Sequence, residues 1–574
     1  MPINIAPPAR TFVSNSLEIK TWSDIEHYFI DLEQRQINSL SDFLLWLTNR
    51  SELETVIAEN LAWRYIRMTC YTDNKTYEEA YTFFITELDP KISPYNNKLN
   101  IKFIQSPFLN ELNDSRFQNS IRSAQRAIQI YRDENIPLIA DMQQKEQKYG
   151  AIAGAMTIHY NDKELTLQQA SVLLKSKNRE ERKLVYEKII ARRLQDATKL
   201  DQLFDELIKV RTQIAHNAGF DNFRDYKFAA MCRFDYTVSD CMQMHEAISK
   251  SIMPIVKKYD DHRKQILNYE QLLPYDLDVD IDGDTPLKPF KTGTEMMDKA
   301  IACFYKTDTY LGDCMSQLKS MNRIDLDSRI GKAPGGYNYP LYETGVPFIF
   351  MNASGLLRDL VTIVHEGGHA VHSIVTHPLQ QIDFKNFPSE VAELASMSME
   401  LISMEHWDCF FENKEDLKRA RLQHLEDVLT ILPWIACVDK FQHWIYTNPE
   451  HTAAERKIYW TQLHSEFSSK VVDWANYADA RSYLWQKQLH IYEVPFYYIE
   501  YGMAQLGAIA VWRNYKANPQ QAIKQYLDAL RLGYTSGIKE IYKTAGVQFD
   551  FSATYISELC EFVKSEISKI EQAS

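Results

Sequence analysis

Residues 361–375 read VTIVHEGGHAVHSIV and crowd three histidines and one glutamate into eight positions of an otherwise apolar segment. Apolar residues recur three and four positions apart, which predicts a helix. His365 and His369 are four residues apart, so both imidazoles lie on one face of that helix, one turn from each other. Glu366 follows the first histidine and lies beside the pair, where it can hold a water. This HExxH pattern predicts a zinc site with two imidazole ligands and a general base for hydrolysis.

Two glycines and a third histidine in the same segment need separate explanations. Gly367 and Gly368 stand inside the predicted helix, where each glycine costs about 1 kcal/mol relative to alanine. We therefore expect another group to approach this face closely, either at a site or through tight packing. His372 continues the ligand face, but seven residues of helix separate it from His365 by about 10 Å. Because bonds from zinc to nitrogen are about 2 Å, we expect His372 to pack or to support the site rather than to share the ion.

The third zinc ligand must come from another segment. Ser354 is a candidate N-cap for the HExxH helix, and Pro378 ends that helix. The next helix begins near Pro388 and Ser389. Because the connection between the two prolines is short, the two helices are predicted to pack as an antiparallel pair.

Three glutamates of the second helix, Glu390, Glu393 and Glu400, share one face at spacings of three and seven. Glu393 lies in the first turns of its helix, opposite the last turns of the HExxH helix, so we choose it as the third ligand. Glu400 lies two turns farther on, where it can accept a hydrogen bond from a ligand imidazole. The neighbours of Glu393 are small or apolar, which argues against an ordinary solvated glutamate.

Composition limits the class of protein and its partners. The chain has 574 residues, of which 45% are hydrophobic and 25% are charged, as in soluble globular proteins of several packed subdomains. A net charge of −13 disfavours nucleic acid and anionic membranes as partners. The eight cysteines form no CxxC pair, and we find neither a signal peptide nor an apolar run of membrane-spanning length. We expect a cytoplasmic protein that is a monomer or a weak oligomer.

Helical periodicity dominates the chain and predicts a mostly α fold. Residues 328–352 differ, because turn signals surround the run VPFIFMN, and they predict a small sheet. We expect an N-terminal helical region over residues 1–200 and a catalytic region over residues 201–574. The stretches with helical periodicity are 22–60, 116–147, 165–216, 236–272, 293–320, 415–447, 453–472 and 517–544.

The segments HEGGHAVH and FPSEVAELASMSME together resemble the M3 family of zinc metallopeptidases, the group of oligoendopeptidase F and thimet oligopeptidase. GKAPGGY, VPFIFMN and LHIYEVPFYYIEYGMAQLGA are similar to the same family and look closest to its Pz-peptidase-like members. The likeness covers nearly the whole chain. It implies two helical lobes around a deep substrate channel, with a small β-sheet next to the zincin-type HExxH helix. It also implies one Zn2+ per chain and short peptides as substrates, because the channel excludes folded proteins.

The resemblance carries roles onto matching residues. His365, His369 and Glu393 match the zinc ligands, and Glu366 matches the general base. Glu400 matches the acid that supports a ligand, seven residues after Glu393. These assignments agree with the choices made above from the residues alone.

Residues 489–508 are implied to supply a histidine and tyrosines that donate hydrogen bonds to the developing oxyanion. His490 is the only histidine in the segment, and Tyr498 and Tyr501 are three residues apart and share a helix face. We choose these three residues, with Tyr497 as the rival. The structural alternative is a buried aromatic stripe.

These residues predict a zinc-dependent endopeptidase that hydrolyses short oligopeptides. The glycine-rich GKAPGGY beside VPFIFMN would let an extended peptide approach and pair with a strand edge. One alternative is a zinc hydrolase of a non-peptide substrate on the same fold, because HExxH does not specify the leaving group. A second alternative is a helical binding protein in which HEGGH is accidental.

Overall fold

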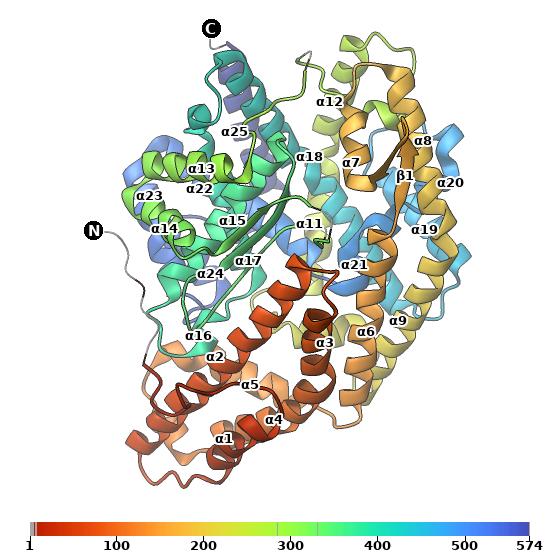
Figure 1. Cartoon of the computed structure of the whole chain (residues 1–574). Coiled ribbons are helices and arrows are strands. Elements are labelled where there is room, and N and C mark those ends of the chain that lie inside the picture. Colours follow the sequence, from red (N-terminus) through yellow and green to blue (C-terminus); the bar gives the residue numbers. More distant parts are fainter. Residues whose placement is uncertain (1–4, 6–8, 284, 330, 334, 573–574) are drawn as a thin grey trace.

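The computed structural model describes residues 5, 9–283, 285–329, 331–333 and 335–572. Helices make up most of this part, together with a two-stranded and a three-stranded sheet (Figure 1). The predicted mostly α fold is confirmed. None of the described helices is long and apolar enough to cross a membrane.

The first helices form a group of their own, drawn in red and orange at the bottom of Figure 1. Ser39 starts the longest of them, because its side chain accepts a hydrogen bond from the Asp42 amide at 3.1 Å. Apolar residues from Val13 to Ala124 form a cluster separate from the main core, joined by Phe384 from the rest of the chain. These helices are α1 (Ser23–Gln34), α2 (Leu40–Cys70), α3 (Lys75–Phe83), α4 (Asp89–Gln105) and α5 (Gln118–Ile130).

The next group contains a hairpin that the periodicity did not predict. Asn161 and Asp162 connect its two antiparallel strands with φ values of 48° and 59°. Two left-handed residues in a two-residue connection are typical of a type I′ turn, for which asparagine and aspartate are favoured. The elements are α6 (Asn135–Gly154), β1 (Thr157–Tyr160), β2 (Lys163–Thr166), α7 (Leu167–Val172), α8 (Arg179–Gln195) and α9 (Ala197–Asn217).

The remaining helices surround the main apolar core. Several predicted stretches are divided by caps: the 293–320 stretch is two helices, because the Asp308 side chain accepts from the Tyr310 amide at 2.7 Å and starts the second one. The first members are α10 (Phe223–Ala230), α11 (Val238–Ser251), α12 (Met253–Ile266), α13 (Gly293–Thr307), α14 (Thr309–Ser320), α15 (Leu357–Thr376), α16 (Ile382–Lys385) and α17 (Ser389–Met404). The others are α18 (Lys414–Thr447), α19 (Ala453–Glu466), α20 (Ala478–Ser482), α21 (Leu489–Glu493), α22 (Tyr498–Ala517), α23 (Pro519–Arg531), α24 (Ile538–Thr544) and α25 (Ala553–Gln572).

The three-stranded sheet lies next to α15. Its strands are β3 (Ile324–Asp327), β4 (Tyr337–Tyr339) and β5 (Phe348–Ala353), in the order β3-β5-β4. β3 is parallel to the central β5, and β4 is antiparallel to it. Because β4 pairs only with β5 in this order, β4 is an edge strand. The sheet predicted from 328–352 is confirmed by β4 and β5, and β3 precedes the predicted range.

Candidate metal centre and active site

Helix α15 carries the HExxH pattern and begins at Leu357. The expected N-cap at Ser354 is wrong by two residues, because the backbone turns at Gly355 with φ of 89° before the helix starts. The Asp359 carboxylate instead accepts from the Ser354 and Leu356 amides at 2.8 and 2.9 Å. An acidic residue in the first turn thus accepts from amides that precede the helix, as the acidic residue of a capping box does.

The two glycines of α15 serve tight packing. A Cβ atom on Gly368 would lie 2.6 Å from Ser396 Cα and 2.7 Å from the Ala395 carbonyl oxygen of α17. A Cβ atom on Gly367 would lie 2.6 Å from the Phe304 ring. α17 begins at Ser389, as predicted. The backbones of α15 and α17 therefore come into direct contact, which brings their polar side chains together.

His365, His369 and Glu393 meet at this contact. Their ligand atoms lie within 4.8 Å of one another. Glu393 Oε2 is 3.3 Å from His365 Nε2 and 3.6 Å from His369 Nε2. A tetrahedral ion with bonds of about 2.0–2.2 Å separates its ligands by about 3.3–3.6 Å. The three donors are therefore spaced to hold one such ion.

Glu400 lies behind the first ligand histidine. Its Oε1 is 2.6 Å from His365 Nδ1, and its Oε2 is 3.6 Å from His424 Nε2. A carboxylate on Nδ1 selects the imidazole tautomer whose Nε2 is free to bind an ion. The structure thus places Glu400 where the spacing along α17 predicted it.

Glu366 is buried beside the three donor residues, with 6% of its surface exposed. Burial raises the pKa of its carboxyl group to about 7, a trend that the neighbouring Glu393 charge reinforces. No described residue donates a hydrogen bond to Glu366 Oε2. The Asn338 side chain of β4 donates to the Glu366 carbonyl at 3.1 Å, so the edge strand passes this residue. A carboxylate with these properties can take up and release a proton near neutral pH.

The aromatic residues chosen from 489–508 come together around His490. Its ring centroid is 4.8 Å from that of Tyr498, 5.7 Å from Tyr501 and 6.0 Å from Tyr497. The chosen trio and its rival are all partly buried. Only the Tyr497 hydroxyl has a hydrogen bond to a proposed ligand among these described residues, donating to Glu393 Oε1 at 2.8 Å.

The other three side chains can act as hydrogen-bond donors. Burial raises the pKa of Tyr498 to about 12 and that of Tyr501 well above its ordinary value, so both hydroxyls keep their protons. Burial lowers the pKa of His490 to about 4, so its imidazole is neutral. The Gln488 amide nitrogen lies 2.6 Å from His490 Nδ1, which leaves Nε2 as the protonated nitrogen of His490.

His372 packs, as expected. Its ring stacks on Phe387 with centroids 3.5 Å apart and an interplanar angle of 11°. Neither ring nitrogen has a hydrogen-bond partner among the described residues, and burial lowers its pKa well below the ordinary value. The side chain is therefore a neutral part of the core.

A second group of metal-capable residues was not found from the sequence. It consists of Cys241 of α11 with Asp439 and His443 of α18, and His245 of α11 lies next to it. Asp439 Oδ2 is 2.9 Å from His245 Nε2 and 3.1 Å from His443 Nε2. These are hydrogen-bond distances, shorter than the separations of the first site, so this group is a buried hydrogen-bonded cluster.

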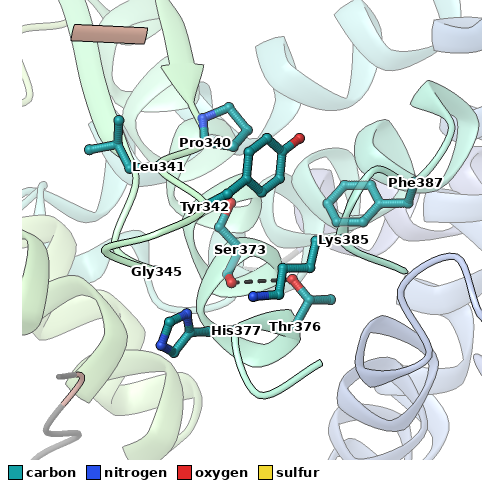
Figure 2. A pocket seen from close by; sticks show the side chains of 9 residues that line it. All are labelled: Pro340, Leu341, Tyr342, Gly345, Ser373, Thr376, His377, Lys385 and Phe387. Atoms are coloured by element: carbon teal, nitrogen blue, oxygen red, sulfur yellow. Dashed lines mark hydrogen bonds between the residues drawn. The ribbon is translucent and has the colours of Figure 1, made fainter. Parts of the chain in front are cut away.

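A small cavity lies at the C-terminal end of α15 (Figure 2). Lys385 is one of the residues that line it, and its side chain is drawn beside Ser373 and Thr376. Within the described residues, the Lys385 ammonium has no hydrogen bond or ion pair. Burial lowers its pKa to about 8. The charged Lys385 ammonium is therefore poorly solvated in this cavity.

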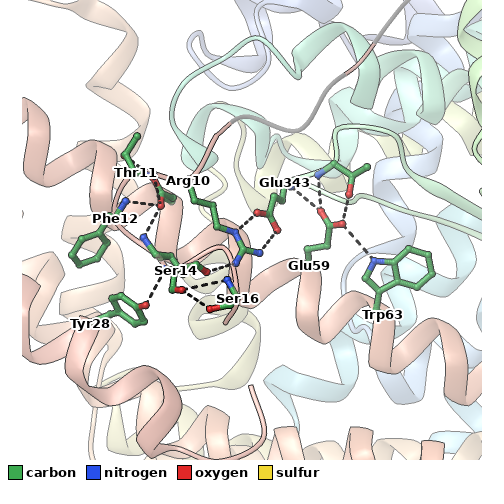
Figure 3. Close-up of polar contacts among 12 residues, drawn as sticks. Arg10, Thr11, Phe12, Ser14, Ser16, Tyr28, Glu59, Trp63 and Glu343 are labelled. Atoms are coloured by element: carbon green, nitrogen blue, oxygen red, sulfur yellow. Dashed lines mark hydrogen bonds and ion pairs between the residues drawn. The ribbon is translucent and has the colours of Figure 1, made fainter. Parts of the chain in front are cut away.

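The loop from β4 to β5 lines this cavity and is fixed by the N-terminal region (Figure 3). The buried Glu59 carboxylate of α2 accepts from the Glu343 and Thr344 amides at 2.9 and 2.8 Å. Arg10 pairs with the Glu343 carboxylate through two hydrogen bonds of 2.5 and 2.9 Å. The N-terminal region thus positions the sheet that passes the candidate site.

The model of peptidase family M3 matches residues 172–560, which is more than half of the chain. The chain belongs to peptidase family M3. The model of the M3 N-terminal domain matches residues 12–131 of the same peptidase. The predicted family resemblance is confirmed, and this M3 peptidase is a metallopeptidase that hydrolyses peptides with a metal cofactor.

The similar proteins of known name are also peptidases. The oligoendopeptidase F homolog of Lactococcus lactis subsp. lactis (strain IL1403) is 26% identical over 424 residues, covering 71% of this chain and 67% of that protein. Oligopeptidase PepF of Bacillus subtilis (strain 168) is 24% identical over 420 residues, covering 72% of this chain and 60% of that protein. The structure of Pz peptidase A with an inhibitor superposes with a TM-score of 0.91 at 25% identity, covering 97% of this chain and 99% of that one.

Proposed function

We propose that this M3 peptidase is a zinc-dependent endopeptidase that cleaves short oligopeptides. The observation that carries the proposal is the spacing of 3.3 and 3.6 Å between Glu393 Oε2 and the two imidazole Nε2 atoms, beside a buried Glu366. His365, His369 and Glu393 would hold one Zn2+ per chain. When bound, zinc acidifies a water and polarises the scissile carbonyl.

Glu366 acts as the general base in this proposal. Its carboxylate takes a proton from the attacking water and passes that proton to the departing amine. The position of Glu366 suits both halves of this transfer, because the side chain is buried beside the ligands and its Oε2 accepts no hydrogen bond from the described residues.

Tyr501 is our first choice as the oxyanion donor. Burial and the charges of Glu393 and Glu366 raise its pKa, so its hydroxyl keeps its proton and can donate to a developing oxyanion. His490 and Tyr498 flank it as additional donors. Tyr497 already donates to Glu393, so we assign it to holding that ligand.

The free edge of β4 is the proposed binding site for the peptide backbone. An extended substrate would add a strand there by main-chain hydrogen bonds. Tyr65 of α2 packs its ring 5.4 Å from Tyr337 and 5.5 Å from Tyr339 of β4. The N-terminal region therefore lies against β4, which supports a substrate-binding edge that extended chains reach more easily than folded proteins.

The division of the chain into residues 1–200 and 201–574 stays a proposal. The separate apolar cluster from Val13 to Ala124 supports an N-terminal unit, while residues from Tyr149 onward join the main core. The net charge of −13 and eight free cysteines support a cytoplasmic enzyme without nucleic-acid or membrane partners. We expect it to act as a monomer or a weak oligomer.

Cleavage of defined peptides tests the proposed function. Mass spectrometry of products from a quenched-fluorescent peptide library, with and without a zinc chelator, should give internal cleavage that the chelator abolishes and added Zn2+ restores. Failure to cleave any member would contradict the proposal and favour a zinc hydrolase of a non-peptide substrate on the same fold.

A further inference from the structure

Phe496 has a backbone conformation that needs outside support. It lies between α21 and α22 with φ of 67°, in the left-handed region that a bulky residue rarely adopts. Its side chain is fully buried. Such a conformation persists only where the surroundings impose it, and it often occurs next to functional residues. Here the next residue is Tyr497, whose hydroxyl reaches Glu393.

Two buried side chains from distant elements hold both backbone polar groups of Phe496. Its amide donates to Gln442 Oε1 of α18 at 2.8 Å. Its carbonyl accepts from Arg233 Nη2, in the connection between α10 and α11. Gln442 is fully buried and the Arg233 side chain is 1% exposed. Neither residue has a part in the proposed chemistry.

Arg233 also fixes the start of the following helix. The same Nη2 atom donates to Glu500 Oε1 in the first turn of α22 at 2.7 Å. The Glu500 amide in turn donates to the Tyr497 carbonyl at 3.0 Å. One guanidinium thus connects the left-handed residue to the helix turn that carries Tyr497 and Tyr501.

Core packing alone does not account for these two side chains. Burying a guanidinium and an amide is costly, and apolar residues would fill the same space at less cost. Arg233 bears part of that cost, because Nε and Nη1 have no hydrogen-bond partner among the described residues and only Nη2 is bonded. The Phe496 ring already has its own packing partners, with centroids 5.2 Å from His443 and 5.5 Å from Tyr446. The polar ends of Arg233 and Gln442 add a constraint on the backbone that the ring does not supply.

We propose that Arg233 and Gln442 are positioning residues that hold Phe496 left-handed and thereby place the Tyr497 hydroxyl on Glu393. The hydrogen bond to Oε1, together with the one that Ser396 Oγ donates to Oε2 at 3.1 Å, orients the Glu393 carboxylate so that Oε2 faces His365 and His369. This inference rests on the proposed function, because it takes Glu393 as the third metal ligand.

A double-mutant cycle on Gln442 and Tyr497 tests the proposal. Gln442→Met removes the acceptor for the Phe496 amide at similar side-chain volume, and Tyr497→Phe removes the donor to Glu393. We expect each variant to weaken zinc binding about tenfold, as is typical for the loss of a group that supports a ligand. Because both act through one contact, the double variant should be no weaker than the weaker single variant. Competition with a chromophoric chelator measures the affinities.

Conservative and matched variants separate positioning from general stability. Gln442→Glu keeps an acceptor oxygen and should restore most of the zinc affinity. Gln486→Met removes another buried glutamine, whose amide donates to the Ala197 carbonyl at 3.0 Å, and should lower the melting temperature without weakening zinc. If Gln442→Met does not fold, Arg233→Lys replaces it in the cycle, since lysine keeps a single donor.

The outcomes distinguish this proposal from the proposed function. A wild-type enzyme that binds no zinc would contradict the proposed function itself. If the wild type binds zinc tightly, two results would overturn only the positioning role. One is an unchanged zinc affinity in Gln442→Met. The other is a loss of zinc affinity in the double variant that equals the product of the losses in the two single variants. The positioning role would be supported if Gln442→Met and Tyr497→Phe both lowered kcat to a similar extent and left KM unchanged.

Discussion

Nδ1 of His365 lies 2.6 Å from Oε1 of Glu400, while Nε2 of the same ring lies 3.3 Å from Oε2 of Glu393. One imidazole thus has a carboxylate on each nitrogen, one in the position of a fellow ligand and one behind it. The two glutamates lie two helical turns apart on α17, so a single helix supplies both. In the proposed site, Glu393 is thus a ligand of the ion and Glu400 orients a ligand.

Replacing Glu400 should weaken metal binding without abolishing it. Glu400→Leu leaves His365 Nδ1 without its carboxylate, so the ring loses its fixed tautomer, and we expect zinc affinity to fall about 10–100-fold. Glu400→Gln keeps an acceptor oxygen but loses the charge, so its zinc affinity should lie between that of the wild type and that of Glu400→Leu. Competition titration with a chelator measures both, and equal affinity in all three proteins would remove Glu400 from this role.

Glu366→Gln should bind zinc normally and lose nearly all activity. The amide cannot accept the proton of the attacking water, and loss of a general base costs typically about 10²–10⁴-fold in rate. Turnover of a fluorogenic peptide and the metal content of the same sample are the two measurements. Near-normal turnover would assign the base to another residue.

Tyr501→Phe should lower kcat by about 10²–10³-fold with little change in KM, because a donor to a developing oxyanion acts mainly in the transition state. Tyr498→Phe, in the same aromatic group, is the matched control and should lose less. A change confined to KM would instead indicate that Tyr501 contacts the bound peptide in its ground state.

Gly368→Ala should destabilise the protein despite the better helix propensity of alanine. Propensity favours alanine by about 1 kcal/mol, but its Cβ would lie 2.6 Å from Ser396 Cα, a backbone atom that cannot move aside. Overpacking of this kind costs typically about 1–3 kcal/mol, so the net effect is a lower melting temperature. Gly154→Ala at the end of α6, where nothing lies within 4 Å of the new Cβ, is the control and should be neutral or slightly stabilising.

Lys385→Met should stabilise the enzyme at neutral pH. The pKa of Lys385 is lowered from 10.5 to about 8 in the folded chain, so the unfolded chain binds more protons between these values. Folding stability therefore rises with pH across that window, and the full cost of the buried cation is present below pH 8. We expect a gain of about 1–2 kcal/mol at pH 7, after discounting for partial exposure, that shrinks by pH 10.5. A gain independent of pH would point to packing instead.

Local spacing explains which parts of the site were predictable. His365, Glu366 and His369 lie within five residues of one helix, where the backbone alone sets their relative directions. The choice of Glu393 and Glu400 followed from the predicted start of the second helix. The β1–β2 hairpin was missed, although Asn161 and Asp162 carry its turn, because their preference for left-handed φ is a two-residue signal between two long helical patterns.

Local reasoning could not show which tyrosine hydroxyl contacts Glu393. Tyr498 and Tyr501 share a helix face, as their spacing predicted, yet the tyrosine that reaches Glu393 is Tyr497. It does so because Phe496 turns left-handed, and the groups that hold Phe496 come from 54 and 263 residues away. No periodicity in 489–508 contains that information.

The sequence by itself determined where most helical segments lie, the HExxH face and the residue types of the candidate metal centre, since these depend on neighbours along the chain. The tertiary structure decided how α15 meets α17 at Gly368, which oxygen of Glu393 faces the imidazoles, and which tyrosine hydroxyl donates to the other oxygen of that carboxylate. Helix propensity and side-chain direction act over a few residues, whereas distances between donor atoms depend on packing between segments that are far apart in the chain.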